Sequence, residues 1–172
     1  MTITLRDLLA RKGDPLQLEP LTGELGLDRP IVDPEVASPG LALAGYTHRF
    51  MPRRLHVLGE TEITYLKELT AEERRDRLGK FFGFDLPVVF VTKAQDVPLE
   101  LLDLARVRGV PLLRTRLKTA EFYKRIKPIM DDVATLGERS RVGRGAPRVT
   151  AGGDGSGSAP APSRRRRPVP PA

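Results

Sequence analysis

The residue types that carry most enzyme chemistry are sparse in this chain and follow no known catalytic pattern. A phosphate-binding loop needs the spacing GxxxxGK[ST], in which backbone amides and a lysine surround phosphate oxygens, and no such string occurs. The nearest stretch is GGDGSGS at residues 152–158, which has the glycines but no lysine. A GxSxG motif, which would place a serine nucleophile, is also absent from the sequence. We therefore predict that this chain carries no catalytic residues.

The sequence gives equally little support for a metal site. It contains two histidines, His48 and His56, and no cysteine. Two ligands eight residues apart do not make a metal site. We interpret both histidines as partly exposed polar residues at strand ends. We expect neither a metal nor a cofactor to be bound by this chain.

Glycines and hydrogen-bonding side chains gather in the stretch SPGLALAGYTHRF at residues 38–50 and just after it. Glycines allow a ligand or another backbone to approach closely, and loops carry many binding residues. The candidate residues for a ligand or partner contact are Gly40, Gly45, Tyr46, His48, Arg49 and Arg54. The alternative is a purely structural turn, because glycines in turns usually serve the backbone.

The net charge of +7 raises the question of nucleic-acid binding, but most of that charge lies at one end of the chain. Residues 137–172 contain eight arginines and two acidic residues, so residues 1–136 carry a net charge of only +1. The arginine run at 164–167 would attract anionic polymers by counterion release. No aromatic residue lies among these arginines to stack on bases, and a solvated tail is the alternative. We therefore do not expect nucleic-acid binding.

The sequence lacks cysteine, a signal peptide and a membrane span at its start, and these features bear on cellular location. Without cysteine there are no disulfides, which argues against an exported, cross-linked fold. The first eleven residues include an acidic residue at position 7 and no long apolar run, so they match neither a signal peptide nor a membrane span. We expect a cytoplasmic protein with no membrane contact.

The apolar pattern predicts one α/β domain over residues 1–136, followed by a disordered basic tail over 137–172. The tail has seven glycines and six prolines in 36 residues and no apolar periodicity. In the domain, the strand PVVFVT (87–92), a helix over 98–108 and the strand VPLL (110–113) form a parallel βαβ unit.

Several further elements are predicted less directly. A helix starts near Thr4 and ends at Gly13. Two short strands are predicted after it, one from Leu16 to Leu21 and one at Ile31 and Val32. A strand at 55–58 precedes a helix at 61–69, and the capping box of Thr70 with Glu73 opens another helix. The last helix covers 119–134, where Pro128 should kink or shorten it.

A series of segments resembles the N-terminal domain of bacterial HPr kinase/phosphorylase. The segments are LDRPIV (27–32), SPGLALAGY (38–46), RRLHVLGETEITYL (53–66), PVVFVTK (87–93) and VPLLRTRLKTAEF (110–122). They run in the same order as in the family over residues 1 to about 136. Each segment alone is generic, and their combined order makes the resemblance specific.

The resemblance implies a fold, an activity and partners for the full-length family. The fold is that of the N-terminal domain of the Mur ligases, and this domain is thought to be regulatory. The full-length proteins form hexamers and use ATP and Mg²⁺ to phosphorylate a serine of the phosphocarrier HPr, and they reverse this by phosphorolysis, within carbon catabolite repression. The family's catalytic residues belong to a later kinase domain and have no counterpart in this sequence.

The departure from the family begins after residue 136, where the expected kinase domain gives way to Gly, Arg, Ala and Pro. We expect a truncated protein that is inactive in phosphoryl transfer, and we hypothesise that a frameshift produced residues 137–172. A second hypothesis is a stand-alone module that senses a metabolite through residues 40–54.

Overall fold

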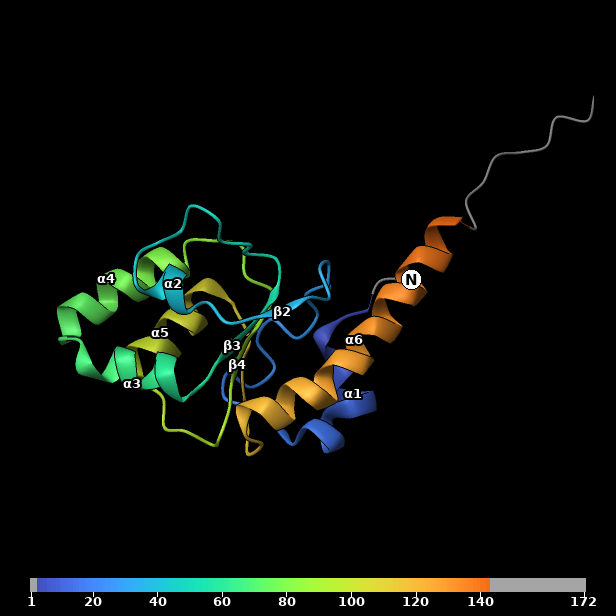
Figure 1. Cartoon of the computed structure of the whole chain (residues 1–172), viewed down its shortest axis with the longest axis horizontal. Helices are drawn as coiled ribbons and strands as arrows, with labels where there is room; N and C mark the ends of the chain where they lie inside the picture. Colours follow the sequence, from blue (N-terminus) through green and yellow to red (C-terminus); the bar gives the residue numbers. More distant parts are fainter. Residues whose placement is uncertain (1–2, 143–172) are drawn as a thin grey trace, which may run out of the picture.

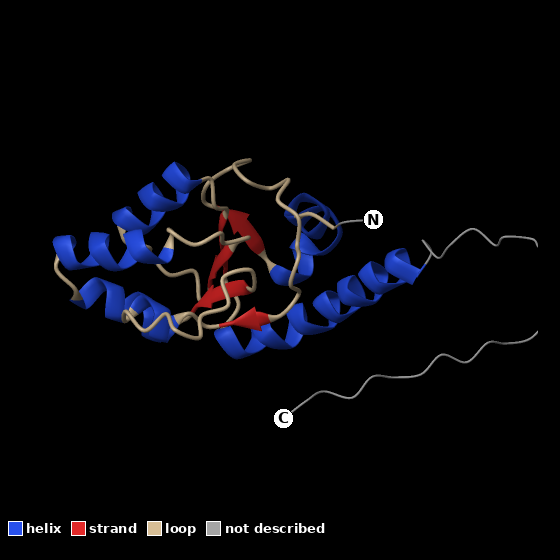
Figure 2. Cartoon of the chain, turned by 90° about the horizontal axis from the view of Figure 1, so that it is seen from above, coloured by secondary structure: helices blue, strands red, loops and turns tan. Residues whose placement is uncertain are grey.

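The computed structural model describes residues 3–142, which form a five-stranded sheet with helices on both faces (Figures 1 and 2). The strands are β1 (Leu18–Pro20), β2 (Val36–Ala37), β3 (Leu55–Leu58), β4 (Val89–Val91) and β5 (Leu112–Thr115). The helices are α1 (Leu5–Leu16), α2 (Gly40–Leu43), α3 (Glu60–Glu68), α4 (Ala71–Phe81), α5 (Leu99–Arg108) and α6 (Thr119–Val142). None of these described helices is long and apolar enough to cross a membrane.

The strands lie in the order β1-β5-β4-β3-β2. Strands β2 to β5 are parallel, and β1 pairs antiparallel with β5 at one edge. Between neighbouring parallel strands the chain passes through helices, as a crossover connection requires. The predicted α/β class and the parallel unit β4-α5-β5 are confirmed.

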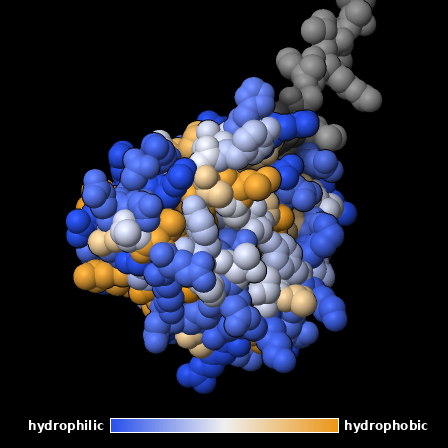
Figure 3. All heavy atoms as spheres, turned by 60° about the vertical axis from the view of Figure 1, so that its left-hand side comes forward, coloured by the Kyte–Doolittle hydropathy of each residue, from blue (hydrophilic) through white to orange (hydrophobic). Residues whose placement is uncertain are grey.

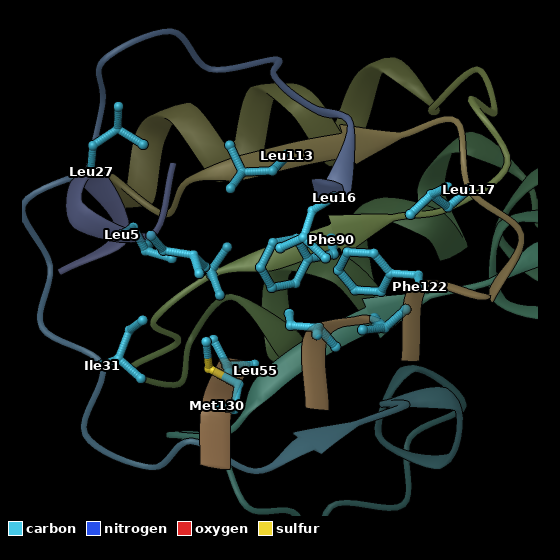
Figure 4. Close-up of a cluster of buried hydrophobic side chains, with 14 residues drawn as sticks. Leu5, Leu16, Leu27, Ile31, Leu55, Phe90, Leu113, Leu117, Phe122 and Met130 are labelled. Carbon is cyan, nitrogen blue, oxygen red and sulfur yellow. The ribbon is translucent and has the colours of Figure 1, made fainter. Parts of the chain in front are cut away.

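Two apolar clusters hold the layers together, one on each face of the sheet. The first joins α1 and α6 to alternate strand residues such as Leu55, Phe90 and Leu113 (Figure 4). The rings of Phe90 and Phe122 meet there at a centroid distance of 5.1 Å. The second cluster joins the other strand residues to α2, α3, α4 and α5. Burial on both faces explains why the parallel strands are almost continuously apolar.

Local signals predicted several helix ends correctly. Thr4 with Asp7 and Thr70 with Glu73 both form capping boxes, in which each side chain bonds the other residue's backbone N–H. Helix α5 ends at Gly109, as predicted. The strand at 55–58 and the helix after it are also present as β3 and α3.

Other boundaries differ from the prediction. Helix α1 continues through Gly13 and Pro15 to Leu16, because burial of Leu16 outweighs the low helix propensity of both residues. Residues 40–43 form the short helix α2 instead of a simple turn. Ile31 and Val32 lie in no strand, and the nearest pairing is a single bridge between Thr4 and Pro30.

Helix α6 is longer than predicted. It continues past Pro128, since Ile126 and Met130 on either side are buried against α1 and the sheet. It ends at Val142, so residues 137–142 belong to the helix and not to the predicted tail. Its last turns point away from the sheet (Figure 1). The prediction of disorder for 143–172 lies outside the described residues.

Candidate functional site

A cavity of about 240 Å³ lies beside β2, α2 and the loop before β3. It is lined by residues from all three segments and from the first half of β3, namely Ala37, Ser38, Pro39, Leu41, Ala42, Tyr46, Arg49, Phe50, Met51, Arg54 and His56. The chain therefore brings the candidate stretch 38–54 around one hollow.

The structure places three of the six predicted contact residues at this cavity, Tyr46, Arg49 and Arg54. His48 is exposed and does not line it.

The two glycines among the predicted contacts do not line the cavity and lie against side chains of α3 and α4. Gly40 faces the Glu62 carboxylate, which a Cβ atom at position 40 would approach to 3.1 Å. Gly45 has φ of +103° and lies against the Arg77 guanidinium, which donates to the carbonyl of Ala44. Both glycines therefore shape the loop.

His56 corrects the sequence-based interpretation of the histidines. It is not a partly exposed residue at a strand end, because it lies within β3 with only 1% of its surface exposed. Its ring lies 4.9 Å from Phe50 and 5.7 Å from Phe81, centroid to centroid. His56 therefore forms part of the wall of the cavity from inside the domain.

The hydrogen bonding of His56 fixes its tautomer. Nε2 lies 3.0 Å from the carbonyl oxygen of Pro52, and because a carbonyl only accepts, Nε2–H must donate. In the neutral ring Nδ1 then carries a lone pair, and this buried atom has no partner among the described residues. An unsatisfied buried polar atom costs about 1–3 kcal/mol. Burial, with a smaller effect from Arg54, lowers the pKa of His56 below its usual 6.5 and so favours the neutral ring.

The two arginines of the cavity differ in their pairing. Arg54 Nε lies 3.6 Å from Asp33 Oδ2, which is an ion pair, but this buried Nε makes no hydrogen bond to any described residue. Arg49 is exposed and forms no ion pair within residues 3–142. No carboxylate lines the cavity itself. The site therefore has a positive potential.

The rim of the cavity also exposes large apolar side chains. Leu41 is 70% exposed, and Tyr46 and Met51 are each 53% exposed. On the side that carries α2, α3 and α4, apolar patches are separated by hydrophilic residues (Figure 3). Apolar walls combined with a few convergent polar groups are typical of sites that bind small molecules.

The arrangement supports binding better than catalysis. A nucleophile needs a base within hydrogen-bond reach, and Nδ1 of His56, the basic atom of this ring, has no hydrogen-bond partner among the described residues. Within the described range, no group of three or more His, Asp or Glu side chains is placed to hold a metal ion.

A second hollow, of about 480 Å³, lies at the carboxyl edge of the parallel strands, where α/β proteins often bind ligands. Its main polar groups are paired with one another. Glu62 accepts from the Ser38 hydroxyl at 2.6 Å and from the Gly59 amide at 2.8 Å, and Glu60 pairs with Lys93. That pairing, led by the hydrogen bond from Lys93, lowers the pKa of Glu60. The cavity beside His56 keeps unpaired polar atoms and is therefore the better candidate.

The sequence analysis did not predict that His56 is buried in β3 and lines the cavity. A signal was present, because His56 interrupts the apolar run LHVL, whose four residues are all buried in β3. A polar residue in a fully buried strand needs a partner or a function.

Comparison with known proteins relates this fold to one family. The sequence profile of the family described as "HPr Serine kinase N terminus" matches residues 3–130. A relative named HPr kinase/phosphorylase from Shouchella clausii is 33% identical over 129 residues, covering 75% of this chain and 40% of the relative. One of the same name from Bacillus mycoides is 37% identical over 113 residues, covering 66% of this chain and 37% of the relative.

The chain thus spans about two fifths of the length of these curated relatives. A solved structure of the CBS and DRTGG domains of the regulatory region of Clostridium perfringens pyrophosphatase aligns with a TM-score of 0.48 and 12% identity, over 75% of this chain and 58% of that one. The profile match covers most of the chain and agrees with the resemblance seen in the sequence, so the chain belongs to the HPr serine kinase N-terminal family.

Proposed function

We propose that this chain acts as a regulatory or assembly domain of the HPr kinase/phosphorylase type, in the cytoplasm and in carbon catabolite regulation, and does not transfer phosphoryl groups by itself. The observation that carries the proposal is the family match over residues 3–130, the region that forms the sheet and its helices. Assembly into a homo-oligomer and contact with HPr belong to the same proposal, for the full-length protein.

The chemistry of phosphoryl transfer supports the negative half of the proposal. Transfer depends on a lysine, backbone amides and Mg²⁺ that neutralise charge around the phosphates. The 172-residue sequence has no GxxxxGK[ST] string, and residues 3–142 contain no cluster of acidic or histidine residues suited to a metal ion. ATP and Mg²⁺ would be needed by a full-length enzyme, not by this chain.

A phosphorylation assay tests the lack of activity. The purified 172-residue chain is incubated with ATP, Mg²⁺ and HPr, beside the full-length Shouchella clausii relative as a positive control. We expect phosphoserine on HPr with the relative and none above background with this chain. Magnesium-dependent phosphorylation of the HPr serine by this chain would refute the proposal.

A chimera tests the regulatory or assembly role. In the relative, the segment that matches residues 3–130 is replaced by those residues of this chain, and a second variant simply lacks the segment. We expect the chimera to keep the relative's oligomeric mass and kinase rate, and the deletion to change at least one of them. If the deletion behaves like the intact relative in both measurements, the segment has no such role.

A second candidate function is the stand-alone sensing of a metabolite. The cavity beside His56 favours it, because Arg49 has no ion pair among the described residues and Nδ1 of His56 has no partner. Sensing would be compatible with the regulatory role, since a ligand bound here would supply the regulatory input.

A further inference from the structure

We infer that the cavity walled by His56 binds a small organic anion, a carboxylate or phosphate monoester with a compact apolar body. Only the description of this ligand as a regulatory input rests on the proposed function. The binding itself is argued from the charge, the apolar lining, the size and the unpaired atoms of the cavity.

The charge of the cavity selects an anion. Arg49 and Arg54 are its charged lining residues, and none of the lining residues is acidic. Arg54 forms an ion pair with Asp33, with 3.6 Å between Nε and Oδ2, whereas Arg49 has no ion pair within the described range. A guanidinium offers paired N–H donors that match the oxygens of a carboxylate or phosphate. Arg49 is therefore the expected head-group contact, supported by the Tyr46 hydroxyl.

The apolar lining selects the body of the ligand. Leu41, Phe50 and Met51 line the cavity, and two of them are more than half exposed to water. Covering such surface is favourable for a ligand with an apolar body. A polyol phosphate would leave these walls facing hydroxyl groups, so an aromatic or short aliphatic body is preferred.

The size of the cavity favours a small molecule over a protein partner. Its volume of about 240 Å³ lies below the roughly 300–1,000 Å³ of sites for drug-sized ligands. A protein partner would instead need about 800 Å² of surface on each side. A compact molecule with one charged head and one ring fits these dimensions.

Two polar atoms without partners in the described part of the chain belong to residues that line this hollow. Arg54 Nε–H and His56 Nδ1 are buried, one a donor and the other an acceptor, and neither has a hydrogen-bond partner within residues 3–142. His56 itself is almost completely buried in β3 and lines the cavity.

Nuclear magnetic resonance can test binding at this site with the full 172-residue chain at pH 7.5. The chain has two histidines, so the Hε1 signals of His56 and His48 can be assigned with a His48→Gln variant. The probes are phenyl phosphate, 3-phenylpropionate, the neutral 3-phenylpropionamide and inorganic phosphate.

We expect the His56 signal to shift saturably with phenyl phosphate or 3-phenylpropionate, and the tighter of the two identifies the head group. The amide should bind about tenfold more weakly because it lacks the charge. Inorganic phosphate should also bind more weakly because it lacks the apolar body.

Matched arginine variants make the test specific. Arg49→Gln should weaken binding about tenfold, whereas Arg53→Gln, in the same loop but outside the cavity lining, should change it less than about twofold. Far-ultraviolet circular dichroism checks that both variants are folded.

The inference is overturned if neither organic anion gives a saturable shift of the His56 signal. It is also overturned if the amide binds as tightly as the acid, or if the two arginine variants weaken binding equally. None of these results would alter the phosphorylation or chimera assays, so the two proposals fail separately.

Discussion

The environment of His56 makes folding sensitive to protonation at a single residue. The ring lies among Phe50, Phe81 and the other side chains around β3, and burial lowers its pKa in the folded state. In the unfolded chain the pKa of the imidazole returns to about 6.5. Between these two values the unfolded chain binds a proton that the folded chain does not, so acid favours unfolding.

The resulting prediction concerns the pH dependence of stability. As the pH falls through about 6.5 toward the lower pKa of folded His56, the free energy of unfolding should decrease, with a limiting slope of about 1.4 kcal/mol per pH unit. Above pH 7.5 this contribution should be flat. Urea unfolding at pH values from 5.5 to 8 measures it, a range above the titration of most carboxylates.

Two variants separate His56 from other groups. His56→Phe keeps an aromatic ring in β3 but cannot titrate, so its stability curve should be nearly flat across this range. His48→Gln removes an exposed histidine and should leave the slope unchanged. The prediction is wrong if His48→Gln, and not His56→Phe, removes the slope.

At the scale of single residues, the sequence predicted which side chains lie at the cavity better than it predicted how buried they are. Tyr46, Arg49 and Arg54 were predicted as contacts from their polarity and their position near glycines, and they do line a common cavity. The predicted role of Gly40, Gly45 and His48 as contacts is still untested. The burial of His56 could not be predicted, because it depends partly on Phe81, 25 positions further along the chain.

At the scale of elements, Arg74 of α4 ties three helices together. Its guanidinium donates to the carbonyls of Leu66 and Leu69 at the end of α3, at 2.6 and 2.9 Å. It also donates to both carboxylate oxygens of Glu100 in α5, at 3.1 Å each. The side chains of both partners are mostly buried, at 16% and 14% exposed. These hydrogen bonds supply donors to carbonyls at the end of α3 that have no partner within the helix.

Replacing Arg74 should therefore destabilise the domain. We expect Arg74→Met to lower the free energy of unfolding by about 2 kcal/mol, because charge-assisted hydrogen bonds are lost and Glu100 is left unpaired. The neighbouring Arg75 is exposed, and Arg75→Met should change stability by less than about 0.5 kcal/mol. Urea unfolding of both variants compares them directly, and equal losses would contradict the role given to Arg74.

Elements whose ends are set by neighbours in sequence were predictable. Both capping boxes and the end of α5 at Gly109 depend on residues within one turn. The end of α1 was not predictable, since this helix is extended by the burial of Leu16 against α6 and the sheet. The passage of α6 through Pro128 depends in the same way on the burial of Ile126 and Met130. Helix α2 was missed because four residues are too few for an apolar period.

At the scale of the whole molecule, the segment before β2 closes one end of the sheet against distant parts of the chain. Arg29 Nε donates to the carbonyl of Gly109 at 3.0 Å, and its Nη1 donates to that of Leu86 at 2.8 Å. Gly26 lies at the same place, where a Cβ atom would meet the Gly109 carbonyl oxygen at 2.6 Å and Pro111 Cδ at 2.7 Å. This contact requires a residue without a side chain.

Two glycines of that segment provide a matched test. Gly23 and Gly26 both have positive φ, +60° and +73°, but a Cβ atom at Gly23 would meet nothing within 4 Å. Gly23→Ala should cost about 1–2 kcal/mol from backbone conformation alone. Gly26→Ala should cost about 1–3 kcal/mol more, because rigid neighbours must move. Equal unfolding free energies for the two variants would show that the close contact does not matter.

The sequence predicted the parallel pair β4 and β5, but neither strand β2 nor the antiparallel edge of the sheet. The sequence places a helix between two closely spaced strands. A short right-handed crossover of this kind makes the two strands, β4 and β5, parallel neighbours. The pairing of β1 with β5 joins residues almost a hundred positions apart, and no local pattern marks it. Only the alternation of leucines around β1 and its last residue, Pro20, are visible in the sequence.

The pairing of Leu18 with Thr115 has a consequence for synthesis on the ribosome. Residues 1–30 emerge before β5 and α6, against which β1 and α1 rest and which are translated about ninety residues later. Because domains fold as their partners become available, α1 leaves the exit tunnel with its leucines exposed to solvent and to chaperones. The nascent chain can close its sheet only after the codons for β5 have been read.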